Sequence, residues 1–492
     1  MVRDIMGNPQ DLAIREITLA SDDEIKAAII ALGGLADKDI INQHILNTLM
    51  LDIRFQKNQG REEIFQRIKK YGISNFKLKE DQTIDEIIQE VISGDTIFLL
   101  DGVDKALSVG SRGWKDRSVA EPITEGVVRG PRDGFTETIR TNTALIRRRI
   151  KSPDLRIHGV KVGERTLTDV LLVYLEGVAK QEVVDEVMHR LQRIKIDGVL
   201  ESGYIEELIE DNPLSPFPQI EHSERPDKVS AAILEGRVAI LVDTTPFVLI
   251  VPTVFIQFIQ ASEDYYERFY LGTMVRMVRI IAFLLSVTLP SVYIALTSFH
   301  QEMIPTPLAL SIAASREGVP FPAIGEAILM ELTFEILREA GIRLPRPIGQ
   351  AVSIVGALVI GEAAVQAGIV SQAMVIIVAL TGICSFAIPA FNAAIAGRLL
   401  RFPLMILASI LGLFGILAGL SVILIHMCGL RSFGVNYFSS VTTVTPQDFK
   451  DVIIRKPWWA MLTRPAMITG DTPQRVEPGL KPGPEHNSEN KE

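Results

Sequence analysis

Cysteine and histidine are scarce in this chain of 492 residues, and their scarcity excludes several classes of protein. The two cysteines, Cys384 and Cys428, lie inside apolar segments, where they predict packing residues and not a disulfide or a metal pair. The seven histidines lack the spacing of metal ligands, and the sequence has no phosphate-binding loop or credible nucleophile arrangement. We therefore expect neither an enzyme nor a bound cofactor or metal.

Positive charge is also in short supply. The 50 lysines and arginines are outnumbered by 59 acidic residues, which gives a net charge of -9. No broad basic face reverses this balance, so a nucleic-acid partner is not expected. The opening residues, MVRDIMGNPQDLAIRE, lack the apolar core of a signal peptide, and we expect the N-terminal half on the cytosolic side of a membrane.

Apolar sequence, in contrast, is abundant in the second half of the chain. Between Pro347 and Gly397 the sole charged side chain is Glu362, flanked by the amides Gln350 and Gln366. This run is longer than the ~20 residues that a membrane-spanning helix needs. Because a carboxylate that faces lipid is costly, an ionisable group here predicts a functional site that faces protein, water or an ion.

The first half mixes helix and strand patterns and predicts a cytosolic α/β domain of two subdomains, residues 1–110 and 111–252. Capping boxes predict one helix from Ser21 to about Gly33 and another from Thr83, the latter followed by a strand at 96–102. After residue 134 we expect a helix, two strands and an amphipathic helix.

A polar segment rich in glycine and proline joins the two subdomains. Its central turn predicts an interdomain hinge in preference to a ligand site, and consists of Gly130, Pro131, Arg132, Asp133 and Gly134. The arginines at 147–149 predict a solvated helix end, where cations complement the helix dipole. The apolar stretch 237–252 predicts a strand–turn–strand hairpin and not a membrane span, since Pro246 and Pro252 would lie inside the helix.

An α-helical polytopic membrane domain is expected at residues 253–428, followed by a cytosolic or interfacial tail, 429–492, that is disordered after about 470. Its strong spans are expected at 274–299, 349–369, 372–396 and 403–428. The segment 321–341 carries Glu326, Glu331 and Glu335, and is expected to be re-entrant, interfacial or a fifth span. We prefer four crossings, although they place the arginine-bearing loops outside, against the positive-inside rule.

Several long motifs occur in a fixed order: EPITEGVVRGPRDGFTETIRTNTALIRRRI, VDTTPFVLIVPT, EDYYERF, IGEAAVQAGIVS and PWWAMLTRP. Together they resemble the A subunit of the GerA family of bacterial spore germinant receptors, from residue 118 to 468. Thr244 stands in the hairpin turn where the family usually has glycine, which alters the expected turn type but not the resemblance.

The resemblance implies a multi-pass protein of the spore inner membrane that works with a transporter-like B subunit and a C subunit lipoprotein. It also implies a homo-oligomer whose helices pass cations when a nutrient binds. The residues themselves suggest a candidate ion path at Glu362, Glu326, Glu331, Glu335, Gln350 and Gln366, because carboxylate rings select cations. The alternatives are a scaffold or signalling subunit that conducts no ions, and a stage V sporulation AF-type paralogue that acts with the dipicolinic acid channel.

Overall fold

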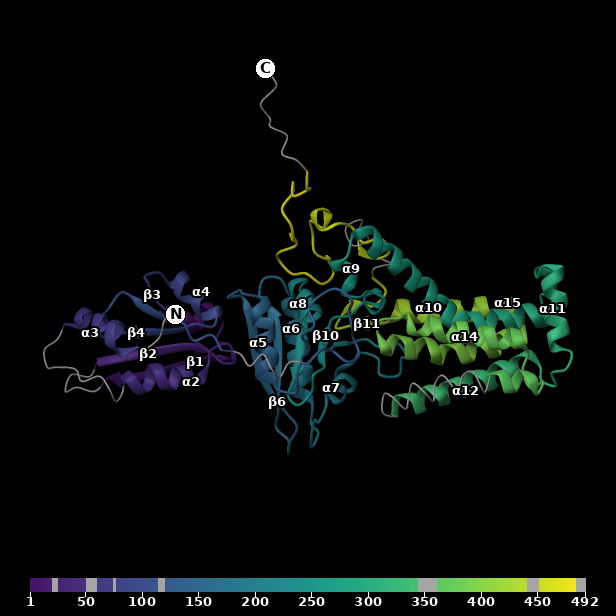
Figure 1. Ribbon diagram of the computed structural model, residues 1–492, viewed down its shortest axis with the longest axis horizontal. Helices are drawn as coiled ribbons and strands as arrows, with labels where there is room; N and C mark the ends of the chain where they lie inside the picture. Colours follow the sequence, from purple (N-terminus) through teal and green to yellow (C-terminus); the bar gives the residue numbers. More distant parts are fainter. Residues whose placement is uncertain are drawn as a thin grey trace, which may run out of the picture.

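The computed structural model describes residues 1–19, 25–49, 60–73, 77–113, 120–343, 361–439 and 451–483. Along these residues, two sheets with their helices are followed by a group of long apolar helices (Figure 1). The first sheet lies at one end of the molecule, the second sheet in the middle and the apolar helices at the other end. The α/β portion followed by a helical portion confirms the expected fold class.

The first sheet contains five antiparallel strands in the order β1-β2-β4-β5-β3. The strands are β1 Leu12–Leu19, β2 Ile25–Leu32, β3 Leu78–Asp81, β4 Thr96–Leu100 and β5 Ala106–Val109. The accompanying helices are α1 Val2–Ile5, α2 Lys38–Ile40, α3 Arg61–Arg67 and α4 Ile84–Ile92. The predicted capping box of α4 is present, with the Thr83 hydroxyl accepting from the Glu86 amide at 3.3 Å and the Glu86 carboxylate accepting from the Thr83 amide at 3.2 Å.

The helix that we predicted from Ser21 to Gly33 is wrong, because Ile25–Leu32 forms strand β2. Ile25, Ala27 and Ile29 pack into the cluster on one face of the sheet, while Ile30 and Leu32 pack on the other. This two-residue alternation is the period of a strand buried on both faces. Pairing with β1 on one side and β4 on the other outweighs the local capping signal.

The second sheet also has five strands, in the order β6-β7-β9-β10-β8. They are β6 Leu155–Val162, β7 Thr168–Leu175, β8 Glu221–Ser223, β9 Val238–Val242 and β10 Val248–Val251. Helices α5 Ile139–Arg149 and α8 Pro226–Leu234 cover one face, and α6 Gln181–Arg193 and α7 Ser202–Ile209 cover the other. Pairing of β9 with β10 confirms the predicted hairpin, and Thr244 occupies its turn with a φ of 75°.

The two sheets are joined by a buried ion pair that the sequence did not suggest. Arg147 of α5 is buried and pairs with Asp11, with Nη2 lying 2.9 Å from Oδ1. Ala144 of α5 also packs into a hydrophobic cluster of the first sheet. The prediction of a solvated helix end is therefore wrong for Arg147, because this face of α5 lies against the first sheet.

The helical portion is built from α10 Phe269–Ser298, α11 Thr306–Arg316, α12 Ala323–Arg343, α14 Gln372–Phe386 and α15 Phe391–Gly429. The short helix α9 Glu263–Tyr266 and a 3₁₀ turn, Phe255–Phe258, lead into it from β10. Within the described residues, α10 and α15 are long and apolar enough to cross a membrane, and α14 is apolar but shorter. The span expected at 349–369 lies partly outside the described residues. In its described part, residues 361–366 are helical.

The expected single span 372–396 is instead two helices, because α14 ends at Phe386 and α15 begins at Phe391. Pro389 lies in the break, where its ring and missing N–H prevent continuation of the helix.

Helix α15 is interrupted at Gly412, where the backbone leaves the helical conformation with φ 63° and ψ -140°. Ala393 near its start and Met427 near its end belong to one hydrophobic cluster, and a Cβ placed on Gly419 would lie 2.5 Å from Leu404. The chain thus reverses at Gly412, and the two halves of α15 pack against each other.

The C-terminal segment 451–476 returns to the second sheet (Figure 1). The Gly470 amide donates to the Val178 carbonyl at 2.7 Å, the Thr472 hydroxyl donates to the Gly177 carbonyl at 2.8 Å, and Arg475 pairs with Glu235 at 3.0 Å. The expectation of disorder from about residue 470 is therefore wrong up to Val476. The polar composition that suggested disorder supplies the hydrogen bonds of this contact. Before this segment, strands β11 Arg431–Ser432 and β12 Val435–Asn436 form a two-residue hairpin.

Candidate functional site

Helix α12 carries three of the carboxylates proposed for an ion path, and the structure places each of them against an arginine. Glu326, near the start of the helix, is fully buried. Its carboxylate accepts from Nε of Arg316 at 3.2 Å and from the backbone amide of Ser371 at 2.8 Å. These bonds tie the start of α12 to α11 and to the start of α14.

Glu331 lies further along α12 and forms an ion pair with Arg401 of α15. Each of the two side chains is 1% exposed. Nε of Arg401 also donates to the Ser286 carbonyl of α10 at 2.8 Å, so the pair connects three helices. In a low-dielectric interior each charge depends on the other, which indicates a structural contact.

Glu335 lies at the end of α12 that faces the second sheet, where two arginines share its carboxylate. Nη1 of Arg338 lies 3.1 Å from Oε1, and Nη1 of Arg398 lies 3.1 Å from Oε2. The Arg338 guanidinium also lies 4.9 Å from the ring centre of Phe334. The three candidate carboxylates of α12 therefore have cationic partners within the chain, which favours structural roles for them.

Glu362 has a different environment, because its side chain is exposed. Its Oε1 accepts from Nε2 of Gln366, one turn further on, at 3.2 Å, and none of the described arginines or lysines forms an ion pair with it. Ala363 and Ala367 beside it are exposed as well. Gln350, the remaining candidate, lies outside the described residues. This face combines a carboxylate that has no ion-pair partner among the described residues, an amide and small side chains.

The predicted hinge segment is held by contacts with its surroundings. Each of its five residues has a close neighbour: Gly130 the Tyr266 ring, Pro131 the Arg225 guanidinium, Arg132 the Glu121 carboxylate, Asp133 the Arg149 guanidinium and Gly134 the Ala120 carbonyl. The contact with Tyr266 links this segment to α9, the short helix that precedes α10. The role of this segment as a hinge stays a prediction.

A buried polar cluster that no sequence motif indicated joins the start of α10 to the C-terminal segment. Arg276 and Arg279 share Asp264, at 3.2 and 2.7 Å, and Arg276 also pairs with Asp451 at 2.8 Å. The Tyr265 hydroxyl donates to Asp451 at 2.5 Å. Two arginines three residues apart at the start of an apolar helix were the available signal, but their partners come from distant parts of the chain.

Burial and neighbouring charges together set the pKa values in this cluster and in the neighbouring network around Lys228 of α8. Burial raises the pKa of Asp451, although Arg276 opposes the shift. Lys228 lies between Glu125 and Glu221, at 2.9 and 2.8 Å; burial lowers its pKa, but the two carboxylates outweigh burial and hold the pKa above the ordinary lysine value. Lys228 is thus a permanent cation in this network.

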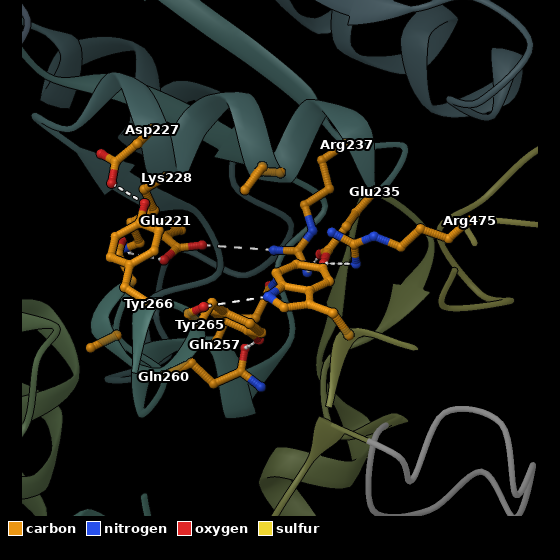
Figure 2. A pocket seen from close by; sticks show the side chains of 15 residues that line it. Glu221, Asp227, Lys228, Glu235, Arg237, Gln257, Gln260, Tyr265, Tyr266 and Arg475 are labelled. Atoms are coloured by element: carbon orange, nitrogen blue, oxygen red, sulfur yellow. Dashed lines mark hydrogen bonds and ion pairs between the residues drawn. The ribbon is translucent and has the colours of Figure 1, made fainter. Parts of the chain in front are cut away.

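A cavity of about 130 Å³ lies between α8 and the C-terminal segment. Figure 2 shows Tyr265 and Tyr266 against it, with Glu235 and Arg475 at one side and Asp227 at the other. Trp458 also lines it, and its indole donates to the Tyr265 carbonyl at 3.4 Å. The cavity is similar in size to the ~150 Å³ cavity that holds benzene in a protein core. Trp458 and Arg475 of the C-terminal segment thus contact Tyr265 and Glu235, and these contacts hold the segment beside the second sheet.

Across the described ranges, no group of three or more His, Cys, Asp or Glu side chains could hold a metal ion. The arrangement is that of a protein with two unlike parts: an α/β portion, and apolar helices that contain buried ion pairs and are fastened to it by the C-terminal segment. This combination indicates a membrane-associated protein.

The chain belongs to the GerA family: residues 1–467 match the family described as "Bacillus/Clostridium GerA spore germination protein". It is 47% identical to spore germination protein KA of Bacillus subtilis over 97% of this chain and 87% of that protein. It is 46% identical to the uncharacterized membrane protein YfkQ of the same organism, over 94% and 89% of the two chains. It is 43% identical to spore germination protein GerLA of Bacillus cereus, over 95% and 94%.

A solved structure is also similar, the N-terminal domain of the A subunit of the Bacillus megaterium spore germinant receptor GerK3. It is 37% identical, covers 52% of this chain and 94% of its own, and superimposes with a TM-score of 0.41. The family resemblance inferred from the motifs is confirmed by the match to the GerA family.

Proposed function

We propose that this chain is the A subunit of a nutrient germinant receptor in the spore inner membrane, where it works with a transporter-like B subunit and a C subunit lipoprotein. Membership of the GerA family and the spore germination proteins among its relatives support this proposal. In it, residues 1–110 and 111–252 form two cytosolic subdomains, residues 253–428 form the membrane domain and residues 429–492 form the tail.

The proposed membrane topology has six crossings in place of the four that we preferred from the sequence. The C-terminal segment forms hydrogen bonds with the second sheet, so both lie on one side and the number of crossings is even. Helices α10, α12 and α14, the two halves of α15 and the span expected from the sequence at 349–369 make six. Arg338 and Arg398 then lie towards the cytosolic side, as the positive-inside rule favours.

The observation that carries the proposed activity is the exposed carboxylate of Glu362. Glu326, Glu331 and Glu335 are each neutralised by arginine, whereas Glu362 lies on an exposed face that also carries Gln366. Facing lipid would be costly for this side chain. Several copies of the chain that brought Glu362 together would form a carboxylate ring, which selects cations. This arrangement supports the proposal of a homo-oligomeric, nutrient-gated cation channel.

A comparison of two variants tests the proposal. Glu362→Gln should leave the level of the protein in spore membranes unchanged while reducing nutrient-triggered cation release from the spores. The matched control is Glu339→Gln, because Glu339 is also an exposed carboxylate on an apolar-region helix but pairs with Arg343. Release from Glu362→Gln spores at the rate of the wild type would contradict the ion path and favour a subunit that signals without conducting.

Co-purification tests the proposed partners. Affinity-tagged protein from dormant spore membranes should retain a transporter-like protein and a lipoprotein. Retention of dipicolinic acid channel proteins in their place would assign the chain to the stage V branch of the family and contradict the nutrient-receptor role.

A further inference from the structure

The carboxylate of Glu335 is shared by two largely buried arginines, and this leaves one positive charge without an acidic partner among the described residues. The side chains of Arg338 and Arg398 are 8% and 12% exposed. Each guanidinium lies 3.1 Å from a different oxygen of Glu335. Burial of a charge is costly unless an opposite charge compensates it. Two cations and one anion therefore call for a second anion at this position.

The acidic side chains described nearby already have basic partners. Glu339 pairs with Arg343, and across the junction with the second sheet Glu125 and Glu221 are matched by Lys228 and Arg237. In addition, Nε of Arg338 is buried and lacks a hydrogen-bond partner among the described residues. The excess charge thus coincides with an unused donor.

Space for an anion lies on both sides of the two arginines. A cavity of about 510 Å³ lies between them and the second sheet, and one of about 600 Å³ lies towards the outer surface of α12 and α15. Arg338 and Arg398 line both cavities. Around them, Phe386, Phe391 and Leu399 present exposed apolar side chains. A ligand here would have an anionic group for the arginines and hydrocarbon for the surrounding surface.

We propose that Arg338 and Arg398 bind the phosphate group of an anionic membrane lipid, whose acyl chains lie against Phe386, Phe391 and Leu399. A guanidinium pair suits a phosphate because its N–H groups match the phosphate oxygens. The position suits a headgroup as well, because it lies at the end of the apolar helices nearest the second sheet, where the bilayer surface would be. This inference rests on the proposed membrane location and not on ion conduction.

The test measures lipid that stays bound to the purified full-length chain. The protein is reconstituted with equal amounts of phosphatidylglycerol and phosphatidylcholine, extracted again in mild detergent, and the retained lipids are quantified by mass spectrometry. The wild type should be enriched in phosphatidylglycerol. Arg398→Gln leaves the Glu335–Arg338 pair intact but removes the excess charge, and should lower the enrichment by about fivefold, the value of one basic residue at an anionic surface.

Two further variants separate this site from general surface charge. Arg343→Gln removes a cation from the cavity of about 600 Å³ that Arg338 and Arg398 also line. Because Glu339 already neutralises Arg343, the enrichment in phosphatidylglycerol should change little. Glu335→Gln leaves two uncompensated arginines and should raise the enrichment. Thermal unfolding of each variant confirms that it is folded.

Equal retention of the two lipids by the wild type would overturn the proposal. So would an enrichment in phosphatidylglycerol that is the same in Arg398→Gln as in the wild type. A separate measurement adds inorganic phosphate to the protein in detergent and follows its thermal unfolding. Stabilisation by phosphate that Arg398→Gln abolishes, without preference for either lipid, would also overturn the lipid assignment and identify free phosphate as the ligand. Since the readout is bound lipid, a negative result leaves the ion path through Glu362 to be decided by its own experiment.

Discussion

Removal of the Glu331 charge should destabilise the helical portion strongly. Glu331→Gln keeps the shape of the side chain but leaves Arg401 buried and uncompensated between α10, α12 and α15. Loss of one partner of a buried pair costs ~3–5 kcal/mol, and we expect about 3 kcal/mol because glutamine can still accept one hydrogen bond. At roughly 2 °C per kcal/mol for a long chain, the unfolding midpoint should fall by about 6 °C.

The assay is thermal unfolding of the purified protein in detergent, followed by circular dichroism. Glu339→Gln is the matched control on the same helix, since its carboxylate is 60% exposed and an exposed pair contributes ~0–1 kcal/mol. The double variant Glu331→Gln/Arg401→Met should regain most of the loss, because it removes the uncompensated cation. Equal midpoints for Glu331→Gln and Glu339→Gln would refute the assignment of a structural ion pair.

Two further predictions concern the reversal of α15 and the second sheet. Gly412→Ala should lower the free energy of unfolding by ~1–3 kcal/mol, because the residue has a positive φ and a Cβ would lie 2.7 Å from His300. Gly429→Ala is the control, since no atom lies within 4 Å of its added Cβ. Equal unfolding midpoints for the two variants would disprove the reversal. Burial and the nearby Glu206 raise the pKa of Glu210 to about 7, so folding stability should be lost as the pH rises from about 4.5 to 7. Glu210→Gln should therefore stabilise the protein by about 1–2 kcal/mol at pH 8, after allowance for partial exposure, and have little effect at pH 4; the same midpoint as the wild type at pH 8 would contradict this.

Local sequence patterns predicted those elements whose own residues determine them. The β9–β10 hairpin was identified because prolines excluded a helix, and α4 because its capping box is formed by residues three apart. Strand β2 was missed because its conformation depends on pairing with β1 and β4. The reversal at Gly412 was missed because glycines recur throughout the apolar segments, and only the packing of the two halves of α15 distinguishes this one.

The candidate site was predictable only in part, for a similar reason. The apolar run identified Glu362 as an isolated carboxylate, and the structure leaves it exposed. The sequence of α12 alone could not show that Glu331 pairs with Arg401, since the partner lies on another helix. The second arginine on Glu335, Arg398, is also contributed by α15. Long-range ion pairs leave no local pattern, so the sequence could not separate structural carboxylates from a functional one.

The reversal potential of the reconstituted receptor tests the central claim most directly, namely that Glu362 lies on a cation path. The chain and its partner subunits are placed in a planar bilayer with a salt gradient, and the nutrient-dependent current is recorded for the wild type, Glu362→Gln and Glu339→Gln. The wild type and Glu339→Gln should show a cation-selective reversal potential, while that of Glu362→Gln should move towards zero. An identical cation-selective potential in all three proteins would contradict the claim.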